Sequence, residues 1–275
     1  MKRSRIHPLA KEVKEQFNSI RDLVQVFFEP DVPFNGLIIC GAAGMGKTHI
    51  VTKTLDDLGI NEKNNNYHLI KGQVSSGQFY IDLYMNHKKG MVVVVDDADI
   101  IGQNKGEMNA IVDFMKSATD VNYGKREVQR NKVNLNQKMK ELDVPERFNF
   151  QGSLIWITNE LPNDLSKRLK GHWEALSSRC NVYSLEFDDE TKFNYTKYLI
   201  EEEDIYGENC YDKPGGFSDA QIDALLDFME KYHKQLKDWT PRRSLKMIAQ
   251  IQLLEKMGKT KDEIERVLVA SSLNN

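Results

Sequence analysis

The sequence predicts an α/β protein with a doubly wound, parallel sheet of five strands, followed by a small helical domain. Three observations support this fold class. Short apolar runs alternate with helix-like patterns up to residue 187. One run, Met91 to Val95, is apolar throughout, which is typical of a strand buried on both faces of a parallel sheet. Beyond residue 187 only helical periodicity remains.

The expected elements alternate along the chain. A helix is expected at 10–28, before Pro30 and Pro33. The expected strands are 36–40, 67–71, 91–95, 153–158 and 182–187, and the helices between them are 49–58, 78–86 and 104–118. Further helices are expected at 190–203, 218–232, 241–256 and 261–270. These patterns predict an N-terminal helical segment (1–32), an α/β domain (33–187) with an insert at 121–150, and a helical domain (188–275).

Composition and charge narrow the class of protein. The chain is 40% hydrophobic and 29% charged, as in ordinary globular proteins. It has no apolar run long enough to span a membrane and no secretory signal, and its three cysteines are scattered. We therefore expect a cytoplasmic protein without a membrane partner. The net charge of -3 argues against a bulk electrostatic grip on nucleic acid, but it permits a local basic patch.

A glycine-rich stretch, Gly41 to Thr48, joins an apolar run to a helical run and reads Gly-Ala-Ala-Gly-Met-Gly-Lys-Thr. This is a P-loop in the context that it requires. Its glycines let backbone N–H groups point inward at phosphates, and the helix that follows favours negative charge. A chance glycine-rich turn is the alternative. We predict ATP and Mg²⁺ as cofactors, with ATP bound by Gly41, Ala42, Ala43, Gly44, Met45, Gly46, Lys47, Thr48 and His49.

Two carboxylates, Asp96 and Asp97, follow the apolar run that ends at Val95. In an open α/β sheet, ligands bind at the carboxyl ends of the strands. Asp96 is therefore expected to hold Mg²⁺ together with Thr48, and Asp97 to polarise the attacking water. The alternative is a solvated strand end without a ligand.

Two arginines open the helix expected at 241–256. Thr240 fits the N-cap and Pro241 the first helical position, so Arg242 and Arg243 lie in the first turn. Cations are unfavourable at this end of the helix dipole unless an anion lies nearby. A bound anion is therefore expected here; tolerated surface charge is the alternative.

The order of these features resembles the AAA+ ATPases. It comprises the P-loop, the paired acids, a strand ending in Thr158-Asn159, the element Ser178-Arg179-Cys180 and a helical lid, and it covers roughly 33–272. The resemblance implies that Asp96 is the magnesium aspartate. Asp97 stands where most members have glutamate, and one methylene less withdraws the carboxylate by about 1.5 Å. We therefore expect slow hydrolysis unless the backbone compensates for the shorter side chain, and Asp99 is a weaker candidate for the same role.

The same resemblance implies roles for three further side chains. Asn159 matches the residue that positions water near the γ-phosphate, although a turn asparagine is the alternative. The Ser-Arg-Cys element is similar to that of sliding-clamp loader subunits, which makes Arg179 an arginine finger that acts on the neighbouring subunit. Arg242, or else Arg243, matches the lid arginine that reaches the γ-phosphate. The implied catalytic set is Lys47, Asp97, Asn159, Arg179 and Arg242. The resemblance also implies assembly into a ring or spiral, which we expect to be a hexamer.

Two regions are candidates for contacts with a substrate polymer. Phe79 and Tyr80 follow the second strand, where ring-shaped relatives face a central pore, but helical spacing favours core packing for them. The insert at 121–150 is basic, and we name Lys125, Arg126, Arg130 and Lys132 as candidate nucleic-acid contacts. Tyr123 and Phe148 could stack on bases. A solvated helical hairpin is the alternative for the insert.

These features favour an oligomeric ATPase that remodels or loads components in DNA metabolism. The compact layout is similar to AAA+ proteins of phages and mobile elements, which would place the chain in a host cytoplasm. DNA and another replication or remodelling protein are the expected partners besides further copies of the chain. Two alternatives stay open: a protein unfoldase that grips with Phe79 or Tyr80, and a slowly hydrolysing switch controlled by ATP.

Overall fold

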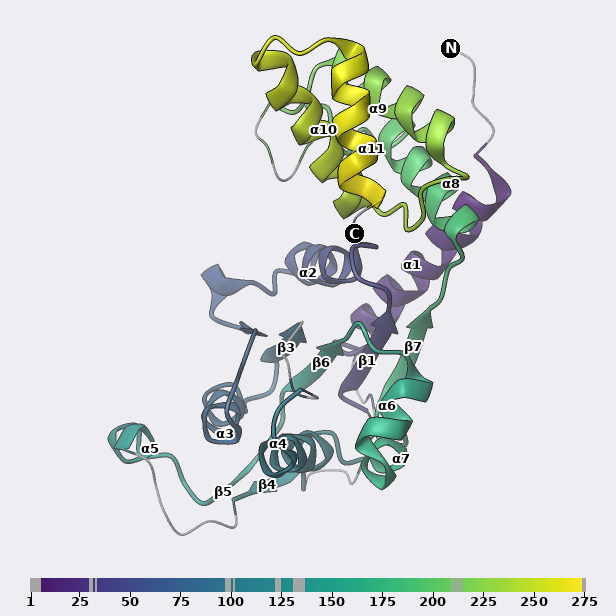
Figure 1. Ribbon diagram of the computed structural model, residues 1–275. Helices are drawn as coiled ribbons and strands as arrows, with labels where there is room; N and C mark the ends of the chain where they lie inside the picture. The colour runs from purple at the N-terminus through teal and green to yellow at the C-terminus, as the bar shows by residue number, and fades with distance from the viewer. Residues whose placement is uncertain are drawn as a thin grey trace. The chain divides into compact units, whose positions relative to one another are not determined.

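The computed structural model describes residues 6–29, 32, 34–96, 100, 102–121, 125–130, 137–208, 210, 213 and 215–273. The chain divides into two compact units. The sheet unit comprises residues 18–42 and 47–186, and the helical unit comprises residues 1–17, 43–46 and 187–275. Each unit is described by itself (Figure 1).

The sheet unit contains the parallel sheet that the sequence predicts. Its five strands lie in the order β2-β3-β6-β1-β7, and every neighbouring pair is parallel. Their bounds are β1 Gly36–Gly41, β2 Tyr67–Lys71, β3 Val92–Asp96, β6 Ser153–Ile157 and β7 Asn181–Leu185. Each lies within about two residues of its expected range, so the five-stranded parallel prediction is confirmed.

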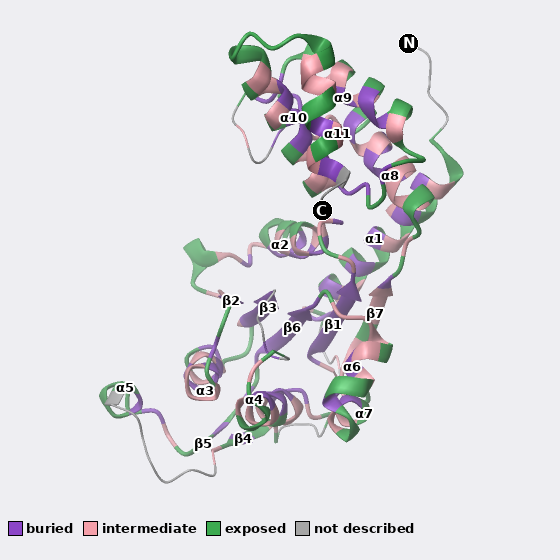
Figure 2. Cartoon of the chain, viewed as in Figure 1, coloured by how far each residue is buried: buried purple, intermediate pink, exposed green. Residues whose placement is uncertain are grey.

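Helices cover both faces of this sheet (Figure 1). Helix α1, Pro8–Val26, belongs to this unit only from residue 18 onward. The sheet unit also contains α2 Lys47–Asp57, the 3-10 helix η1 Glu62–Asn64, α3 Ser76–Met85, α4 Lys105–Ala118, α6 Pro162–Leu169 and α7 Gly171–Ser177. One face of the sheet packs against α3, α4, α6 and α7, and α2 lies on the other. The central strands β1, β3 and β6 are buried along their whole length, as their apolar runs require (Figure 2).

The insert contains more structure than the sequence suggests. Strands β4 Glu127–Gln129 and β5 Arg147–Asn149 pair antiparallel, and helix α5 Gln137–Glu141 lies between them along the chain. Val128 and Phe148 are buried and join the same core as the sheet. A purely solvated helical hairpin is therefore not what forms here. The alternation of polar, apolar and polar residues in each short strand presents one side chain to the core.

The helical unit has its own core. Its helices are α8 Asp189–Glu201, α9 Asp219–Tyr232, α10 Pro241–Lys256 and α11 Lys261–Leu273, and they pack around the buried Trp239. Ser218 and Gln221 form a reciprocal capping box at α9, and Thr260 with Glu263 does the same at α11. The prediction of a helical region after the sheet is confirmed. Within the described ranges, no helix is both long and apolar enough to cross a membrane.

Candidate functional site

Three strand ends meet at the carboxyl edge of the sheet. Strand β6 lies between β1 and β3, and its Ile157 pairs with Asp96 at the end of β3. Just beyond β6, the N–H of Thr158 donates to the carbonyl of Ile39 at 2.9 Å. The glycine-rich loop, Asp96 and Asn159 therefore leave the sheet at one edge, which is where open α/β sheets bind ligands.

The glycine-rich loop begins in a backbone conformation that only glycine adopts easily. Gly41 has φ +141°, Gly44 has φ +79° and Gly46 has φ +98°. A Cβ atom added to Gly41 would come within 2.4 Å of the Leu185 carbonyl oxygen on β7. The glycine spacing of the motif thus reflects both backbone torsion and the close approach of a neighbouring strand.

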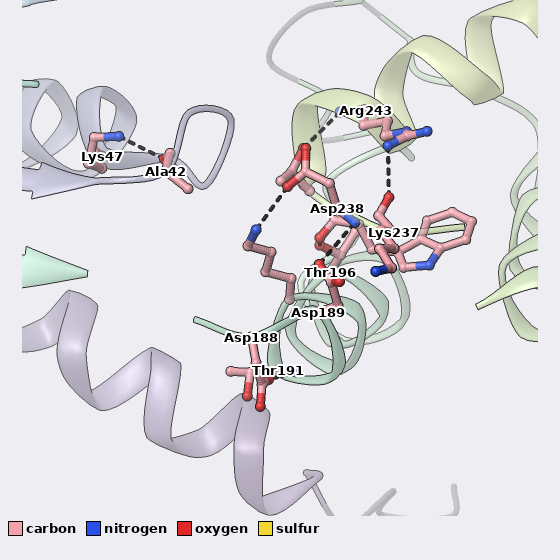
Figure 3. Close-up of polar contacts among 12 residues, drawn as sticks. Ala42, Lys47, Asp188, Asp189, Thr191, Thr196, Lys237, Asp238 and Arg243 are labelled. Atoms are coloured by element: carbon pink, nitrogen blue, oxygen red, sulfur yellow. Dashed lines mark hydrogen bonds and ion pairs between the residues drawn. The ribbon is translucent and has the colours of Figure 1, made fainter. Parts of the chain in front are cut away.

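Lys47 is the first residue of α2 and is buried, with 5% of its surface exposed. Its ammonium donates to the carbonyls of Gly41 at 2.7 Å and Ala42 at 2.8 Å, and to Asn159 Oδ1 at 2.9 Å; Figure 3 shows the contact with Ala42. Burial raises the pKa of the nearby Cys40 thiol to about 12, although the Lys47 charge opposes that shift. A buried ammonium at the start of a helix suits a phosphate ligand, because the helix start also favours negative charge.

Thr48 and Asp96 form an oxygen-rich pair beside this lysine. The Thr48 hydroxyl donates to Asp96 Oδ1 at 2.7 Å, and the other carboxylate oxygen lies 3.4 Å from Lys71 Nζ. A hydroxyl and a carboxylate are hard oxygen ligands of the kind that Mg²⁺ accepts, because this ion commonly keeps waters and nucleotide phosphates as its remaining ligands. The two side chains therefore fit the predicted magnesium site.

Several residues for which the sequence predicts a functional role lie outside the part of the chain that the structure describes. They are Asp97, Asp99, Tyr123 and Lys132. Their predicted roles, as water-activating acids and as nucleic-acid contacts, stay predictions.

Arg179 lies at the opposite end of the sheet from Lys47. It comes two residues before Asn181, which pairs with Leu37 near the start of β1, whereas Leu185 pairs with Gly41 at the loop. Asn181 and Leu185 are four residues apart along the strand, which corresponds to about 13 Å. The Arg179 guanidinium donates to the Ala175 carbonyl at 2.5 Å. Within one chain, the structure does not bring Arg179 to the site formed by Lys47 and Asp96.

The two arginines of α10 have different surroundings in the helical unit. Arg243 donates through its side chain to the carbonyl of Lys237 at 2.7 Å (Figure 3). It also donates to the carbonyl of Ser272 at 2.8 Å, and its backbone N–H is capped by Thr240. Arg242 is exposed. Arg243 thus braces the helical unit, which leaves Arg242 as the better-placed candidate for an anion.

A basic pocket opens at the start of α10. Its volume is about 360 Å³, and its lining includes Gly44, Thr240, Arg242, Arg243, Lys246 and Ser272. Gly44 is packed so closely that an added Cβ would lie 2.9 Å from Thr240 Oγ1. Asp238, which also lines the pocket, pairs with Lys192 at 2.9 Å. The three basic side chains and the helix start together favour an anionic ligand.

The insert residues are placed differently from one another. Lys125 is exposed, and Arg126 Nε donates to the Asp120 carbonyl at 2.8 Å. Arg130 lies over the Tyr80 ring at 5.8 Å, with its Nε and Nη2 buried. Phe148 is buried and packs edge-on against Tyr80 at 5.2 Å. The expectation that Phe148 could stack on bases is wrong, because its ring completes the core.

The structure thus brings together Lys47, Thr48, Asp96 and Asn159 from three different segments: the start of α2, the end of β3 and the turn after β6. Sequence reasoning did not single out Lys71, the last residue of β2, which contacts Asp96. The available signal was its position at the carboxyl end of a predicted strand. Phe79 and Tyr80 are fully buried, as the core-packing interpretation expected.

Comparisons with known proteins place this geometry among related folds. No protein-family model matches the chain. A curated relative is 26% identical over 250 residues, covering 86% of this chain and 72% of the relative; it is an uncharacterized 36.7 kDa protein from the nrdC-mobD intergenic region of Enterobacteria phage T4.

Solved structures share the fold at low identity. The RuvB Holliday junction branch migration motor of Thermotoga maritima has a TM-score of 0.52 and 16% identity, covering 95% of this chain and 68% of RuvB. Domain III of the Thermotoga maritima replication initiation protein DnaA has a TM-score of 0.50 and 15% identity, covering 99% of this chain and 100% of that domain. Aeropyrum pernix ORC1, in complex with DNA, has a TM-score of 0.51 and 14% identity, with coverages of 94% and 64%. These solved structures share the fold of this chain, a five-stranded parallel sheet with a helical C-terminal region.

Proposed function

We propose that this chain is an ATPase that binds ATP and Mg²⁺ at the carboxyl edge of its sheet. The observation that carries the proposal is the cluster in which Lys47 contacts Asn159 at 2.9 Å while Thr48 contacts Asp96 at 2.7 Å. The sequence supplies the P-loop, and the fold gathers the two polar strand ends beside it. A nucleoside triphosphate needs this combination of a cation, N–H donors and oxygen ligands for its metal.

Each side chain would have a distinct task in that reaction. Lys47 would exchange its carbonyl acceptors for the β- and γ-phosphates, and Thr48 with Asp96 would hold the metal. The metal, when bound, supplies positive charge that neutralises the phosphate oxygens. Asn159 would orient the attacking water with its exposed amide, and Asp97 would accept the proton from that water. Arg242 would contribute charge from the helical unit.

Hydrolysis would require a second copy of the chain. Within one chain Arg179 lies about 13 Å of strand away from the loop end of the sheet. An arginine finger stabilises charge in the transition state only when it touches the phosphates. We therefore propose that Arg179 acts on the neighbouring copy, in a ring or spiral that we expect to be a hexamer.

A role in DNA metabolism is the biological function that we propose. It is supported by relatives of the fold that are named for branch migration of Holliday junctions, for replication initiation and for a complex with DNA. The similarity to a T4 protein supports a phage context and hence a host cytoplasm. Among the predicted contacts in the insert that the structure describes, we propose that Lys125 and Arg126 contact DNA. Arg130 is not included, because it packs against Tyr80.

The unfoldase alternative has little support. Its proposed grip, Phe79 or Tyr80, lies in the core, so neither ring is available to a threaded chain.

The test is ATP hydrolysis by the full chain with and without single- or double-stranded DNA, alongside the mass of the particle in ATP. We expect Mg²⁺-dependent turnover, stimulation by DNA that falls with salt, and assembly in ATP. A particle that stays monomeric while hydrolysing ATP would contradict the role of a neighbouring copy. Assembly without product release would instead favour the ATP-controlled switch.

A further inference from the structure

Edge strand β2 places a cation beside the carboxylate that we assign to magnesium. Lys71 is the last residue of β2 and is the register partner of Asp96, the last residue of β3. Register partners on adjacent parallel strands project their side chains to the same face of the sheet. Lys71 Nζ lies 3.4 Å from Asp96 Oδ2. The contact therefore follows from strand register and not from a chance surface rotamer.

The two oxygens of Asp96 have different partners. Oδ1 accepts from the Thr48 hydroxyl at 2.7 Å, and Oδ2 faces Lys71. The Asp96 side chain is only 4% exposed, whereas that of Lys71 is 57% exposed. Lys71 thus approaches a buried carboxylate from the solvent side, and the ammonium can leave for water at little cost.

A second residue on the same face responds to this carboxylate. Burial, and then the negative charge of Asp96, raises the pKa of Tyr67 to about 12. Its buried hydroxyl has no hydrogen-bond partner in the part of the chain that the structure describes. Tyr67 therefore stays a neutral neighbour, and Lys71 provides the cationic contact to Asp96.

We propose that Lys71 is a positioning residue that competes with Mg²⁺ for Asp96. This inference rests on the proposed function, because it concerns the same site. The Lys71 ammonium, 3.4 Å from Oδ2, holds the carboxylate in place through the ion pair. When a divalent ion takes the carboxylate, the ammonium must withdraw, because two cations repel at such short range. Lys71 would therefore raise the Mg²⁺ requirement for tight nucleotide binding.

The competition predicts a specific coupling between the metal and the nucleotide. The dissociation constant of an ATP analogue carrying a fluorescent methylanthraniloyl group is measured with excess EDTA and again with Mg²⁺. The value in EDTA divided by the value in Mg²⁺ is the ratio that reports the coupling. In Lys71→Met, the affinity in EDTA should match wild type, since Lys71 contacts Asp96 and not the phosphates. The ratio should rise about two- to fivefold, which is the size expected for one exposed ion pair.

Two further variants sharpen the test. Lys71→Arg keeps the cation and should keep the wild-type ratio. Lys89→Met removes the same charge at an exposed position before β3, at the other end of the sheet, and should also leave the ratio unchanged. Circular dichroism checks that each variant folds, and Lys71→Gln replaces Lys71→Met if the latter does not.

The outcomes separate this inference from the proposed function. An unchanged ratio in Lys71→Met would overturn the competition, and so would weaker binding in EDTA, which would make Lys71 a phosphate ligand. Both results would leave the ATP site itself intact. If wild-type protein bound the analogue in neither condition, the proposed function would fail and the inference with it.

Discussion

The ammonium of Lys47 and the amide oxygen of Asn159 lie 2.9 Å apart, although 112 positions separate them in the sequence. One residue opens α2 and the other follows β6, so the contact joins the end of the glycine-rich loop to the end of the strand next to β1. A γ-phosphate that pairs with Lys47 would compete with this hydrogen bond. In our account Asn159 is thereby released to hold water when ATP binds.

Changing Asn159 should separate binding from hydrolysis. Asn159→Ala removes one acceptor of Lys47 and should leave ATP affinity equal to or above that of wild type. It should lower the hydrolysis rate about 100-fold, the order of loss seen when one positioned polar group is removed from an active site. Asn159→Asp should instead weaken ATP binding, because its carboxylate would hold the Lys47 cation more strongly.

Titration calorimetry and steady-state phosphate release measure the two effects. Asn194→Ala, in helix α8 of the helical unit, is the control and should change neither. Wild-type turnover in Asn159→Ala would remove Asn159 from the mechanism.

Arg179 should act on the neighbouring copy and not on its own. Arg179→Ala should bind ATP but lose hydrolysis, and Lys47→Ala should lose ATP binding. When the two inactive variants are mixed, a Lys47→Ala subunit can present its intact Arg179 to the intact site of an Arg179→Ala subunit. We therefore expect the mixture to recover hydrolysis, which phosphate release measures.

The control for the mixing experiment is Arg21→Ala, which removes an arginine at an exposed position of α1. This variant should hydrolyse ATP at the full rate without any second variant present. If the mixture stayed inactive although the subunits assembled, or if Arg179→Ala alone hydrolysed ATP normally, the action in trans would be refuted.

Alkaline pH should destabilise the protein partly through Cys40. Burial raises the pKa of this thiol from 9.0 to about 12, so between these values the folded chain keeps a proton that the unfolded chain loses. Stability is therefore full below pH 9 and falls as the pH rises towards 12. The contribution of one such group approaches about 1.4 kcal/mol per pH unit.

Urea unfolding at several pH values between 9 and 11 measures this slope. Cys40→Ala removes the thiol and should flatten the decline relative to wild type. Val51→Ala, at another fully buried position, should lower stability by a similar amount at every pH and keep the wild-type slope. Equal slopes in wild type and Cys40→Ala would contradict the buried-thiol explanation.

The sequence predicted the sheet and the loop because both depend on local patterns. An apolar run such as Met91 to Val95 has few alternatives to a buried strand, and a glycine-rich turn before Lys47 fixes its own context. The proximity of Asp96 and Asn159 could also be predicted from the sequence, because the carboxyl ends of parallel strands share one edge of the sheet.

The parts of the fold and of the site that the sequence did not predict depend on tertiary contacts, which local patterns do not reveal. The strands β4 and β5 have three residues each, too few for alternation to be a clear signal. Phe148 is buried because Tyr80 and Tyr84 surround it, and no neighbour in the sequence indicates this. Lys71 is part of the site only because strand register places it beside Asp96, and the sequence alone does not give that register.

The central claim is that ATP binds at Lys47, and calorimetric titration of the full chain with ATP and Mg²⁺ tests it most directly. We predict saturable binding by wild type and at least about a 100-fold loss in Lys47→Ala, because removing one partner of a buried charged contact costs about 3 kcal/mol or more. Lys53→Ala, about 1.7 turns further along α2, should bind as wild type does. No binding by wild type, or equal binding by Lys47→Ala, would contradict the account.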